Sequence, residues 1–277
     1  MTDNRVPLAG VIGAPIGHSR SPRIHGHWLA SLGFRGFYIP MDVSSENLGD
    51  VLGTLPKMGF RGVNITVPHK EQALALADTV TDRARAIGAT NTLTYGLGGR
   101  IEADNTDGYG FLQNLRQAAP DWQADRGPAA VLGAGGAARA VIVALLEAGA
   151  PRILMSNRTR ARAEKLESEF GPRIEVIDWA QAGNMLEDAT TVVNTTSLGM
   201  TGNPPLCVPL DGLRKGTVVN DLVYAPLQTP FLADAARHGC IAVDGLGMLL
   251  HQAVPGFERW FGVRPEVDAA AREAALK

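Results

Sequence analysis

Hydrophobic and polar positions alternate along the chain in two patterns, one typical of strands and one typical of helices. Short apolar runs bounded by glycine, proline or polar residues predict strands. Apolar residues spaced three and four apart between these runs predict amphipathic helices. The expected strands are 8–14, 37–43, 62–67, 91–95, 100–103, 129–132, 152–156, 174–177, 191–194, 218–221 and 241–243. Strands that alternate with helices predict an α/β fold with a largely parallel sheet.

Capping and breaking residues refine this outline. Ser21 is expected to be the N-cap of the first helix, with Pro22 at the first helical position. The strands 91–95 and 100–103 flank a glycine-rich turn, which predicts a hairpin. Near the end of the chain, Pro255-Gly256 is expected to break or kink a helix.

The stretch 129–162 combines several of these signals. A short apolar strand leads into the turn Gly133-Ala134-Gly135-Gly136-Ala137, a helix follows to about Glu147, and a second strand ends at Ser156. Glycines let the backbone turn tightly and approach a bulky anion, and the helix directs free N–H groups toward that anion. The pattern predicts a dinucleotide-binding unit, and the alternative is an ordinary strand–helix turn.

The residues after the second strand favour NADP over NAD. An NAD site usually has Asp or Glu there to bind the ribose 2′-hydroxyl, whereas this chain has Asn157 followed by Arg158, Arg160 and Arg162. Guanidinium groups bind phosphate oxygens with paired hydrogen bonds. A solvated basic helix start is the alternative interpretation.

Composition narrows the classes of protein and partner. The chain has 277 residues, 45% of them hydrophobic and 19% charged, with a net charge of -2. This is typical of a globular protein of about two domains, without a general affinity for nucleic acid or membranes. The N-terminus lacks a signal-peptide pattern, and Cys207 and Cys240 form no disulfide framework. We therefore expect a cytoplasmic protein, and the spacing of its histidines predicts no metal site.

Polar residues at predicted strand ends are candidates for chemistry. Ser19 and Ser21 could hold a carboxylate beside a helix start, or Ser21 could serve only as a cap. Asn64 and Thr66 share one face of a strand whose other face is apolar. Their polar groups therefore require partners or a ligand.

Reduction of a carbonyl by a nicotinamide requires a proton donor at the oxygen. Lys70, just past a strand end, and Asp107, at the expected domain junction, form the candidate pair, although an isolated lysine there is more often a surface charge. Asn91, Tyr224 and Gln252 are further polar candidates near predicted element ends.

With these stretches in place, the chain resembles the shikimate dehydrogenases almost end to end. The matching motifs are Gly13-x-Pro15-Ile16-x-His18-Ser19-x-Ser21-Pro22, Asn64-x-Thr66-x-Pro68-x-Lys70, Gly88-Ala89-x-Asn91-Thr92, Asn105-Thr106-Asp107-Gly108, Gly133-Ala134-Gly135-Gly136-Ala137, Asn157-Arg158-Thr159 and Gly247-Met248-Leu249 through Gln252. The resemblance implies reversible NADP-dependent reduction of 3-dehydroshikimate to shikimate on the route to aromatic amino acids.

The resemblance also implies roles for individual residues. Lys70 and Asp107 would be catalytic. Ser19 and Ser21 would bind the substrate carboxylate. The remaining substrate-binding residues would be Asn64, Thr66, Asn91, Tyr224 and Gln252, together with the catalytic pair. The cofactor-binding residues would be Gly133, Ala134, Gly135, Gly136, Ala137, Asn157, Arg158, Thr159, Arg162, Thr196, Leu222 and Gly245.

The implied architecture is a two-lobed α/β protein. Residues 1–107 would form the substrate-binding catalytic domain, 108–244 a Rossmann-type NADP-binding domain, and 245–277 C-terminal helices that return to the first domain. The partners would be the small-molecule substrate and NADP, and the protein would be a monomer or homodimer. The alternatives are a quinate/shikimate dehydrogenase that uses NAD and a non-catalytic NADP-sensing paralogue. Ser21 and Arg158 favour shikimate and NADP.

Overall fold

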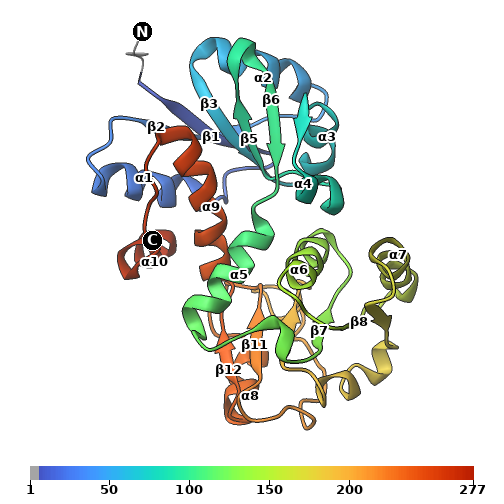
Figure 1. Cartoon of the computed structure of the whole chain (residues 1–277). Helices are drawn as coiled ribbons and strands as arrows, with labels where there is room; N and C mark the ends of the chain where they lie inside the picture. The colour runs from blue at the N-terminus through green and yellow to red at the C-terminus, as the bar shows by residue number, and fades with distance from the viewer. Residues whose placement is uncertain (1–5) are drawn as a thin grey trace. The chain divides into compact units, whose positions relative to one another are not determined.

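The computed structural model describes residues 6–277, and these residues form two compact α/β units (Figure 1). The first unit contains the described residues up to Asp107 together with Leu250–Lys277, and the second unit is Gly108–Leu249. The chain therefore leaves the first unit after Asp107 and re-enters it at Leu250. The α/β class predicted from the sequence is confirmed.

The first unit is built on a six-stranded mixed sheet with the order β2-β1-β3-β5-β6-β4. Its strands are β1 (Leu8–Gly13), β2 (Phe37–Asp42), β3 (Phe60–Ile65), β4 (Thr79–Val80), β5 (Thr92–Tyr95) and β6 (Ile101–Asp104). Strands β1, β2 and β3 are parallel, whereas β5 is antiparallel to both β3 and β6. The predicted hairpin is confirmed as β5–β6, and β4 was not expected.

Helices of the first unit cover its sheet and bury an aromatic cluster. They are α1 (Ser21–Ser31), α2 (Leu48–Thr54), α3 (Lys70–Ala75), α4 (Asp82–Ile87), the later part of α9 (Leu246–Phe261) and α10 (Ala269–Leu276). Phe257 of α9 packs edge-on against Trp28 of α1, with ring centroids 5.5 Å apart. These buried rings fix α9 against α1, so the end of the chain belongs structurally to the first unit.

The expected N-cap of the first helix is wrong, and so is the expected break at Pro255-Gly256. Arg20, not Ser21, is the N-cap of α1, and its backbone is already helical, so no side chain caps the first turn. Helix α9 continues through Pro255 and Gly256 without interruption. A Cβ at Gly256 would lie 2.9 Å from Trp260, so the glycine lets that ring pack onto the helix. Proline at 255 has no N–H to donate within the helix, yet the helix continues past it.

The second unit contains a six-stranded parallel sheet in the order β9-β8-β7-β10-β11-β12. The strands are β7 (Ala129–Leu132), β8 (Ile153–Ser156), β9 (Ile174–Val176), β10 (Thr191–Asn194), β11 (Val218–Asp221) and β12 (Ile241–Val243). The strand order runs outward in both directions from β7 and β10, which is the order of dinucleotide-binding folds. The predicted Rossmann-type unit is confirmed.

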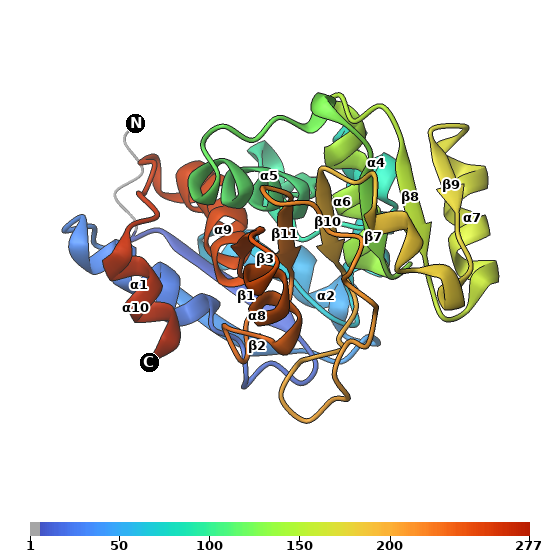
Figure 2. The same ribbon diagram turned by 90° about the horizontal axis from the view of Figure 1, so that it is seen from below.

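Helices lie on both faces of this parallel sheet. They are α5 (Asp107–Ala118), α6 (Gly136–Glu147), α7 (Arg160–Phe170) and α8 (Pro230–Arg237). Figure 2 shows α5 and α6 on one side of the sheet and α8 on the other. Residues of β7 alternate accordingly: Val131 packs in the cluster that includes α5 and α6, and Leu132 packs in the cluster that includes α8. A strand buried on both faces needs apolar residues throughout, as this one has.

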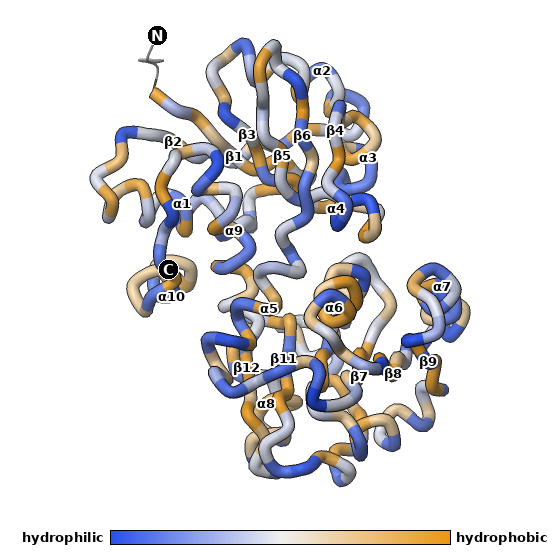
Figure 3. Tube along the Cα trace, viewed as in Figure 1, coloured by the Kyte–Doolittle hydropathy of each residue, from blue (hydrophilic) through white to orange (hydrophobic). Residues whose placement is uncertain are grey.

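Burial also explains the different compositions of the helices. Figure 3 shows α6 as mainly hydrophobic and α7 as mainly hydrophilic. Most of the side chains of α6 from Ala138 to Leu145 are buried, whereas α7 buries Ala163 and Leu166. Helix α6 therefore anchors the glycine turn that precedes it to the core of the second unit.

Candidate active site

Polar residues from three strands gather at one edge of the first sheet, the edge at which β3 and β6 end and β5 begins. Asn64 of β3 pairs with Thr92 at the start of β5, and Thr92 pairs with Asp104 at the end of β6. Because β5 runs antiparallel to both neighbours, its first residue lies beside the carboxyl ends of β3 and β6. The segments that continue from these ends carry Lys70, Asn91 and Asp107.

Lys70 and Asp107 form an ion pair at this edge. Lys70 begins α3 and Asp107 begins α5, and Lys70 Nζ lies 2.7 Å from Asp107 Oδ2. The side chains are 31% and 17% exposed, so both are largely enclosed and still accessible to a small molecule. Asn91 Nδ2 donates to the other carboxylate oxygen of Asp107 at 2.7 Å. The carboxylate is therefore held from two sides, with its orientation fixed.

Asn91 links this pair to the C-terminal helix α9. Its Nδ2 also donates to Gln252 Oε1 at 3.1 Å. Its Oδ1 accepts hydrogen bonds from the Thr106 backbone N–H at 2.9 Å and from the Thr92 hydroxyl at 2.8 Å. The Thr106 hydroxyl in turn donates to the backbone carbonyl of Gln252 at 2.8 Å. The buried amide of Asn91 thus fixes the positions of Asp107 and Gln252 together.

Asn64 is tied to the same network and to Tyr38. Asn64 Nδ2 donates to the Asn91 carbonyl at 3.0 Å, and Tyr38 donates its hydroxyl proton to Asn64 Oδ1 at 2.7 Å. Burial raises the pKa of Tyr38 well above its ordinary value, and a hydrogen bond with the Ser21 side chain opposes that shift. Tyr38 therefore bridges Ser21 and Asn64, which both come from the predicted substrate-binding set. This role of Tyr38 was not predicted from the sequence, because a tyrosine in an apolar strand is expected there for packing alone.

The remaining hydroxyl candidates of the first unit are less enclosed. Ser19 Oγ accepts the backbone N–H of Ser21 at 3.4 Å, and the Ser19 side chain is half-buried. Thr66, directly after β3, is also half-buried. A Cβ at Gly13 would lie 2.6 Å from Thr66 Cγ2, so glycine at that position lets the threonine lie against β1.

A buried histidine supports Tyr38. The ring of His25, on α1, stacks on the Tyr38 ring with centroids 3.8 Å apart and planes 5° from parallel. His25 is fully buried, and within the described part of the chain neither ring nitrogen has a hydrogen-bond partner. Burial lowers the pKa of His25 to about 3. His25 is therefore a neutral aromatic support at neutral pH.

The second unit gathers its candidate residues at the carboxyl edge of its sheet. The ends of β7, β8, β10 and β11 are in register, since Leu132 pairs with Ser156 and Asn194, and Asn194 pairs with Asp221. The residues that follow these ends therefore lie along one edge. They are Gly133, Asn157, Thr195, Thr196 and Leu222.

The glycine turn has the geometry of an anion site. Gly133 has φ 110°, and a Cβ there would lie 2.6 Å from Thr195 Oγ1. A Cβ at Gly135 or Gly136 would meet nothing within 4 Å, so space is open above the turn. No side chain caps the start of α6, whose first N–H groups have no partner within the helix. A pyrophosphate fits this arrangement of exposed backbone donors and positive helix end.

The polar residues after β8 separate into two groups. Asn157 Oδ1 accepts the Ala134 N–H at 3.2 Å, and its Nδ2 donates to the Thr159 carbonyl at 2.8 Å, so it braces the turn. Arg158 and Arg162 are exposed. Arg160, by contrast, donates to Glu164 at 2.7 Å and to Asp178 at 2.5 Å. Of the three arginines expected near the adenosine ribose, Arg160 therefore already has two acidic partners.

The other cofactor candidates line the same edge. The Thr196 hydroxyl donates to Asn194 Oδ1 at 2.7 Å. A Cβ at Gly245 would lie 2.2 Å from the Leu222 carbonyl oxygen, so only glycine allows these backbones to meet. Tyr224 follows β11 in the second unit and is half-buried. The structure thus places Tyr224 with the nucleotide-edge residues of its own unit.

The described residues also bear on metal binding and membrane insertion. Over residues 6–277, His, Cys, Asp and Glu side chains form no cluster of three or more that could hold a metal ion. In the same range, every helix is too short or too polar to cross a membrane.

Family models match three parts of the chain, and sequence relatives match nearly all of it. Family models match residues 11–93 (shikimate dehydrogenase substrate binding domain), 116–200 (shikimate/quinate 5-dehydrogenase) and 245–275 (shikimate 5′-dehydrogenase C-terminal domain). The chain is 63% identical to the shikimate dehydrogenase (NADP(+)) of Paracoccus denitrificans, over 99% of this chain and 98% of that protein.

Solved structures extend the comparison. The shikimate 5-dehydrogenase of Thermus thermophilus, in complex with NADP(H) and shikimate, matches with a TM-score of 0.85 and 39% identity over 98% of this chain and 99% of that chain. The quinate dehydrogenase of Corynebacterium glutamicum, in complex with NAD, matches with a TM-score of 0.89 and 31% identity over 98% and 99%.

The fold and the two polar edges define an α/β protein whose first unit carries a lysine–carboxylate pair and whose second unit is a dinucleotide-binding fold. Its sequence relatives give the narrower class. The chain belongs to the shikimate dehydrogenase family.

The burial of His25 predicts a specific dependence of stability on pH. Its pKa is about 3 in the folded chain and near 6.5 when exposed, so the unfolded chain binds the proton first as pH falls. Stability should fall with pH between these values, by up to about 1.4 kcal/mol per pH unit for this one group. His25→Phe keeps a flat ring and should remove this part of the dependence. Urea unfolding of both proteins at pH 7.5 and 5 measures it, and parallel losses in the two proteins would contradict the prediction.

Proposed function

We propose that this chain is an NADP-dependent shikimate dehydrogenase, which reversibly reduces 3-dehydroshikimate to shikimate on the route to chorismate and the aromatic amino acids. The relatives named above support the reaction. The observation that carries the proposal is the accessible Lys70–Asp107 ion pair, held by Asn91 beside Gln252. An ammonium group beside amide groups suits proton transfer to an oxygen of a hydroxylated ring.

Lys70 and Asp107 would carry the proton transfer. In the reducing direction, Lys70 Nζ would donate a proton to the carbonyl oxygen of the substrate, and Asp107 would orient the ammonium group beforehand. In the oxidising direction, the lysine would accept the proton from the hydroxyl group. When bound, NADPH contributes hydride chemistry. The hydrogen bond from Asn91 to Asp107 would keep the carboxylate in place in both directions of the reaction.

Substrate recognition would come from the other polar residues. Ser19 and Ser21 would bind the carboxylate of the substrate. Other residues would contact the ring hydroxyls or position the ring, namely Asn64, Thr66, Asn91, Tyr224 and Gln252. The hydrogen bonds that hold Asn64 and Asn91 support this role, because a fixed amide loses little freedom when a ligand binds.

Cofactor binding would use the carboxyl edge of the second unit. The turn from Gly133 to Ala137 would bind the pyrophosphate. The adenosine phosphate would be bound by Asn157, Arg158, Thr159 and Arg162, and the rest of the cofactor would extend past Thr196, Leu222 and Gly245. The exposure of Arg158 and Arg162 supports their assignment, since Arg160 is bound to acidic residues.

The domain roles follow from these assignments. Residues 1–107 would be the substrate-binding catalytic domain and residues 108–244 the NADP-binding domain. Residues 245–277 would be C-terminal helices that pack on the substrate-binding domain. We further propose a cytoplasmic protein that acts as a monomer or homodimer and takes only small-molecule partners.

Substrate and cofactor choice is the first test, because the fold is shared with a quinate dehydrogenase. We expect a higher kcat/KM for shikimate with NADP than for quinate with NAD, since Ser21 and Arg158 are retained. Steady-state absorbance assays with both substrates and both cofactors measure this. A higher kcat/KM for quinate with NAD would favour the alternative, and no turnover of either substrate would favour a sensing role.

Removal of the lysine tests the proton-transfer role. Lys70→Ala should lower kcat roughly 100-fold or more with a modest change in KM, as expected for loss of a general acid–base group. Lys57→Ala is a matched control, since Lys57 is exposed in the 3-10 turn Leu55–Met58 and should leave kcat unchanged. Normal turnover by the Lys70 variant would remove this residue from the mechanism.

Removal of one arginine tests phosphate recognition. Arg158→Ala should raise KM for NADP about tenfold or more and leave KM for NAD nearly unchanged, because NAD lacks the 2′-phosphate. Arg152→Ala serves as the control, since Arg152 pairs with Glu175 at the opposite end of β8. Equal effects of Arg158→Ala on both cofactors would contradict the assignment.

A further inference from the structure

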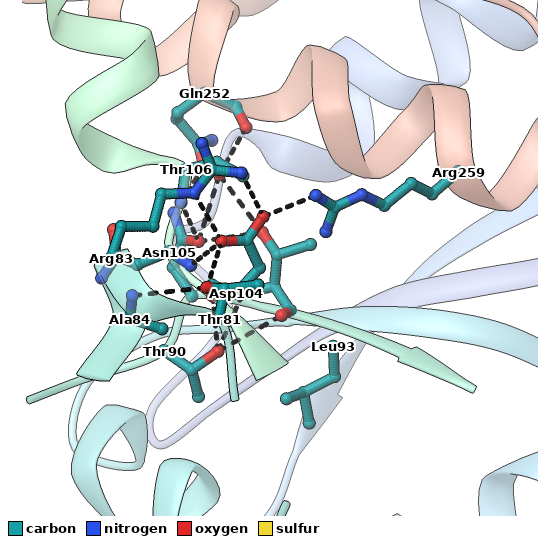
Figure 4. A network of polar contacts seen from close by, with 12 residues as sticks. Thr81, Arg83, Ala84, Thr90, Leu93, Asp104, Asn105, Thr106, Gln252 and Arg259 are labelled. Carbon is teal, nitrogen blue, oxygen red and sulfur yellow. Dashed lines mark hydrogen bonds and ion pairs between the residues drawn. The ribbon is translucent and has the colours of Figure 1, made fainter. Parts of the chain in front are cut away.

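A second charged cluster lies within the first unit, three residues before Asp107. The carboxylate of Asp104, at the end of β6, is completely buried and receives hydrogen bonds from two guanidinium groups. Arg83, on α4, binds both oxygens at 2.7 and 2.8 Å, and Arg259, on α9, binds Oδ2 at 2.6 Å. Figure 4 shows the two arginines reaching Asp104 from opposite sides.

The Asp104 carboxylate accepts two further hydrogen bonds. Its Oδ1 accepts the Thr81 hydroxyl at 2.8 Å and the backbone N–H of Asn105 at 2.8 Å. Burial by itself raises the pKa of Asp104, but the hydrogen bonds from Arg83, Thr81 and Arg259 outweigh burial and hold the pKa well below its ordinary value. The carboxylate is therefore charged at neutral pH, and its two arginines remain bound to it.

The cluster extends directly to the Lys70–Asp107 pair. Three successive backbone N–H groups donate to side-chain oxygens: Asn105 to Asp104 at 2.8 Å, Thr106 to Asn91 at 2.9 Å and Asp107 to Asn105 at 3.0 Å. Side chains therefore set the path of the backbone from the end of β6 to Asp107. The first bond in this series depends on the orientation of the Asp104 carboxylate.

The same residue also orients Asn91. The backbone carbonyl of Asp104 accepts the Asn91 N–H at 3.2 Å and the Thr90 hydroxyl at 2.6 Å. Asn91 in turn donates to Asp107. A shift of Asp104 would therefore move the ion pair through two routes, the 105–107 segment and Asn91.

Helix α9 contacts this region at two points on one face. Gln252 accepts the Thr106 hydroxyl and the Asn91 amide, and Arg259 binds Asp104. These two residues are two helical turns apart, so they project from the same side of α9. The Arg259–Asp104 pair thus fixes the axial position of α9 relative to the residues that Gln252 contacts.

We propose that Asp104, Arg83 and Arg259 are positioning residues that hold Asp107 and Asn91 in register with Gln252 for the reaction. The proposal deepens the proposed function and rests on it for its kinetic part. These three side chains act through Asn105, Thr106 and Asn91, while Lys70 and Asp107 perform the proton transfer. A cluster with only a structural role would stabilise the fold without changing the turnover of the folded enzyme.

The test removes one arm of the cluster. In Arg259→Ala, Asp104 keeps both bonds to Arg83, so the fold should hold while the carboxylate gains freedom. We expect kcat for shikimate oxidation to fall about tenfold, with KM for NADP within about twofold, because small displacements of reacting groups have large effects on rate. Arg259→Lys should restore most of the loss. Glu258→Ala is the control, because Glu258 lies next to Arg259 on α9 but pairs with Arg264, which follows the helix.

Amide hydrogen exchange provides a measurement that does not depend on activity. In Arg259→Ala, the amides of Asn105, Thr106 and Asp107 should exchange at least about tenfold faster, with those of β1 unchanged. Unchanged exchange at the three amides, or a normal kcat in a variant whose melting temperature falls, would overturn the proposal. Absence of shikimate turnover in the unaltered chain would instead refute the proposed function, and the exchange data would still decide the positioning role.

Discussion

The antiparallel placement of β5 between β3 and β6 is the constraint on which the candidate active site depends. In a fully parallel sheet, the residue before a strand lies at the opposite edge from the residues after its neighbours. Here Asn91 precedes β5 and still meets Asp107, which follows β6. This one reversal brings an amide from one segment to a carboxylate from another. The Lys70 ammonium group then pairs with this carboxylate, with Nζ 2.7 Å from Asp107 Oδ2.

The second unit brings its candidate residues together through a parallel sheet instead. Its sheet is entirely parallel, so the carboxyl ends of its strands already share an edge, and short loops supply Gly133, Asn157 and Leu222 there. The two edges also differ in how they are held. Side chains such as Asn91 and Asn64 hold the first edge through buried hydrogen bonds, each of which would cost about 1–3 kcal/mol if left unmade. Backbone geometry holds the second, through the left-handed Gly133 and the close contact of Gly245 with Leu222.

Local sequence patterns predicted most helices and strands. The predictions failed where a residue's role depends on a partner far away in the sequence. The strands, the hairpin and the glycine turn could be predicted because alternation and glycine spacing act within a few residues. Ser21 fitted the pattern of an N-cap, but its hydroxyl interacts with Tyr38 on another element. The role of Tyr38 depends on Asn64, 26 positions away, which no local pattern indicates. Pro255 was expected to break or kink α9, but the helix continues through it, with Trp260 packed close to Gly256. Arg160 looked available until its acidic partners were located in space.

The sequence thus identifies the reacting residues of the site more readily than the residues that hold them in place. Lys70 and Asp107 could be chosen from their types and places, whereas the geometry that couples them belongs to the sheet. The most direct measurement is a crystal structure of the chain with shikimate and NADP bound. We expect Lys70 Nζ within hydrogen-bond distance of the hydroxyl oxygen that becomes the carbonyl, with the nicotinamide ring facing the carbon that bears it. A complex in which Lys70 and Asp107 both lie outside contact with the bound ring would contradict this mechanism.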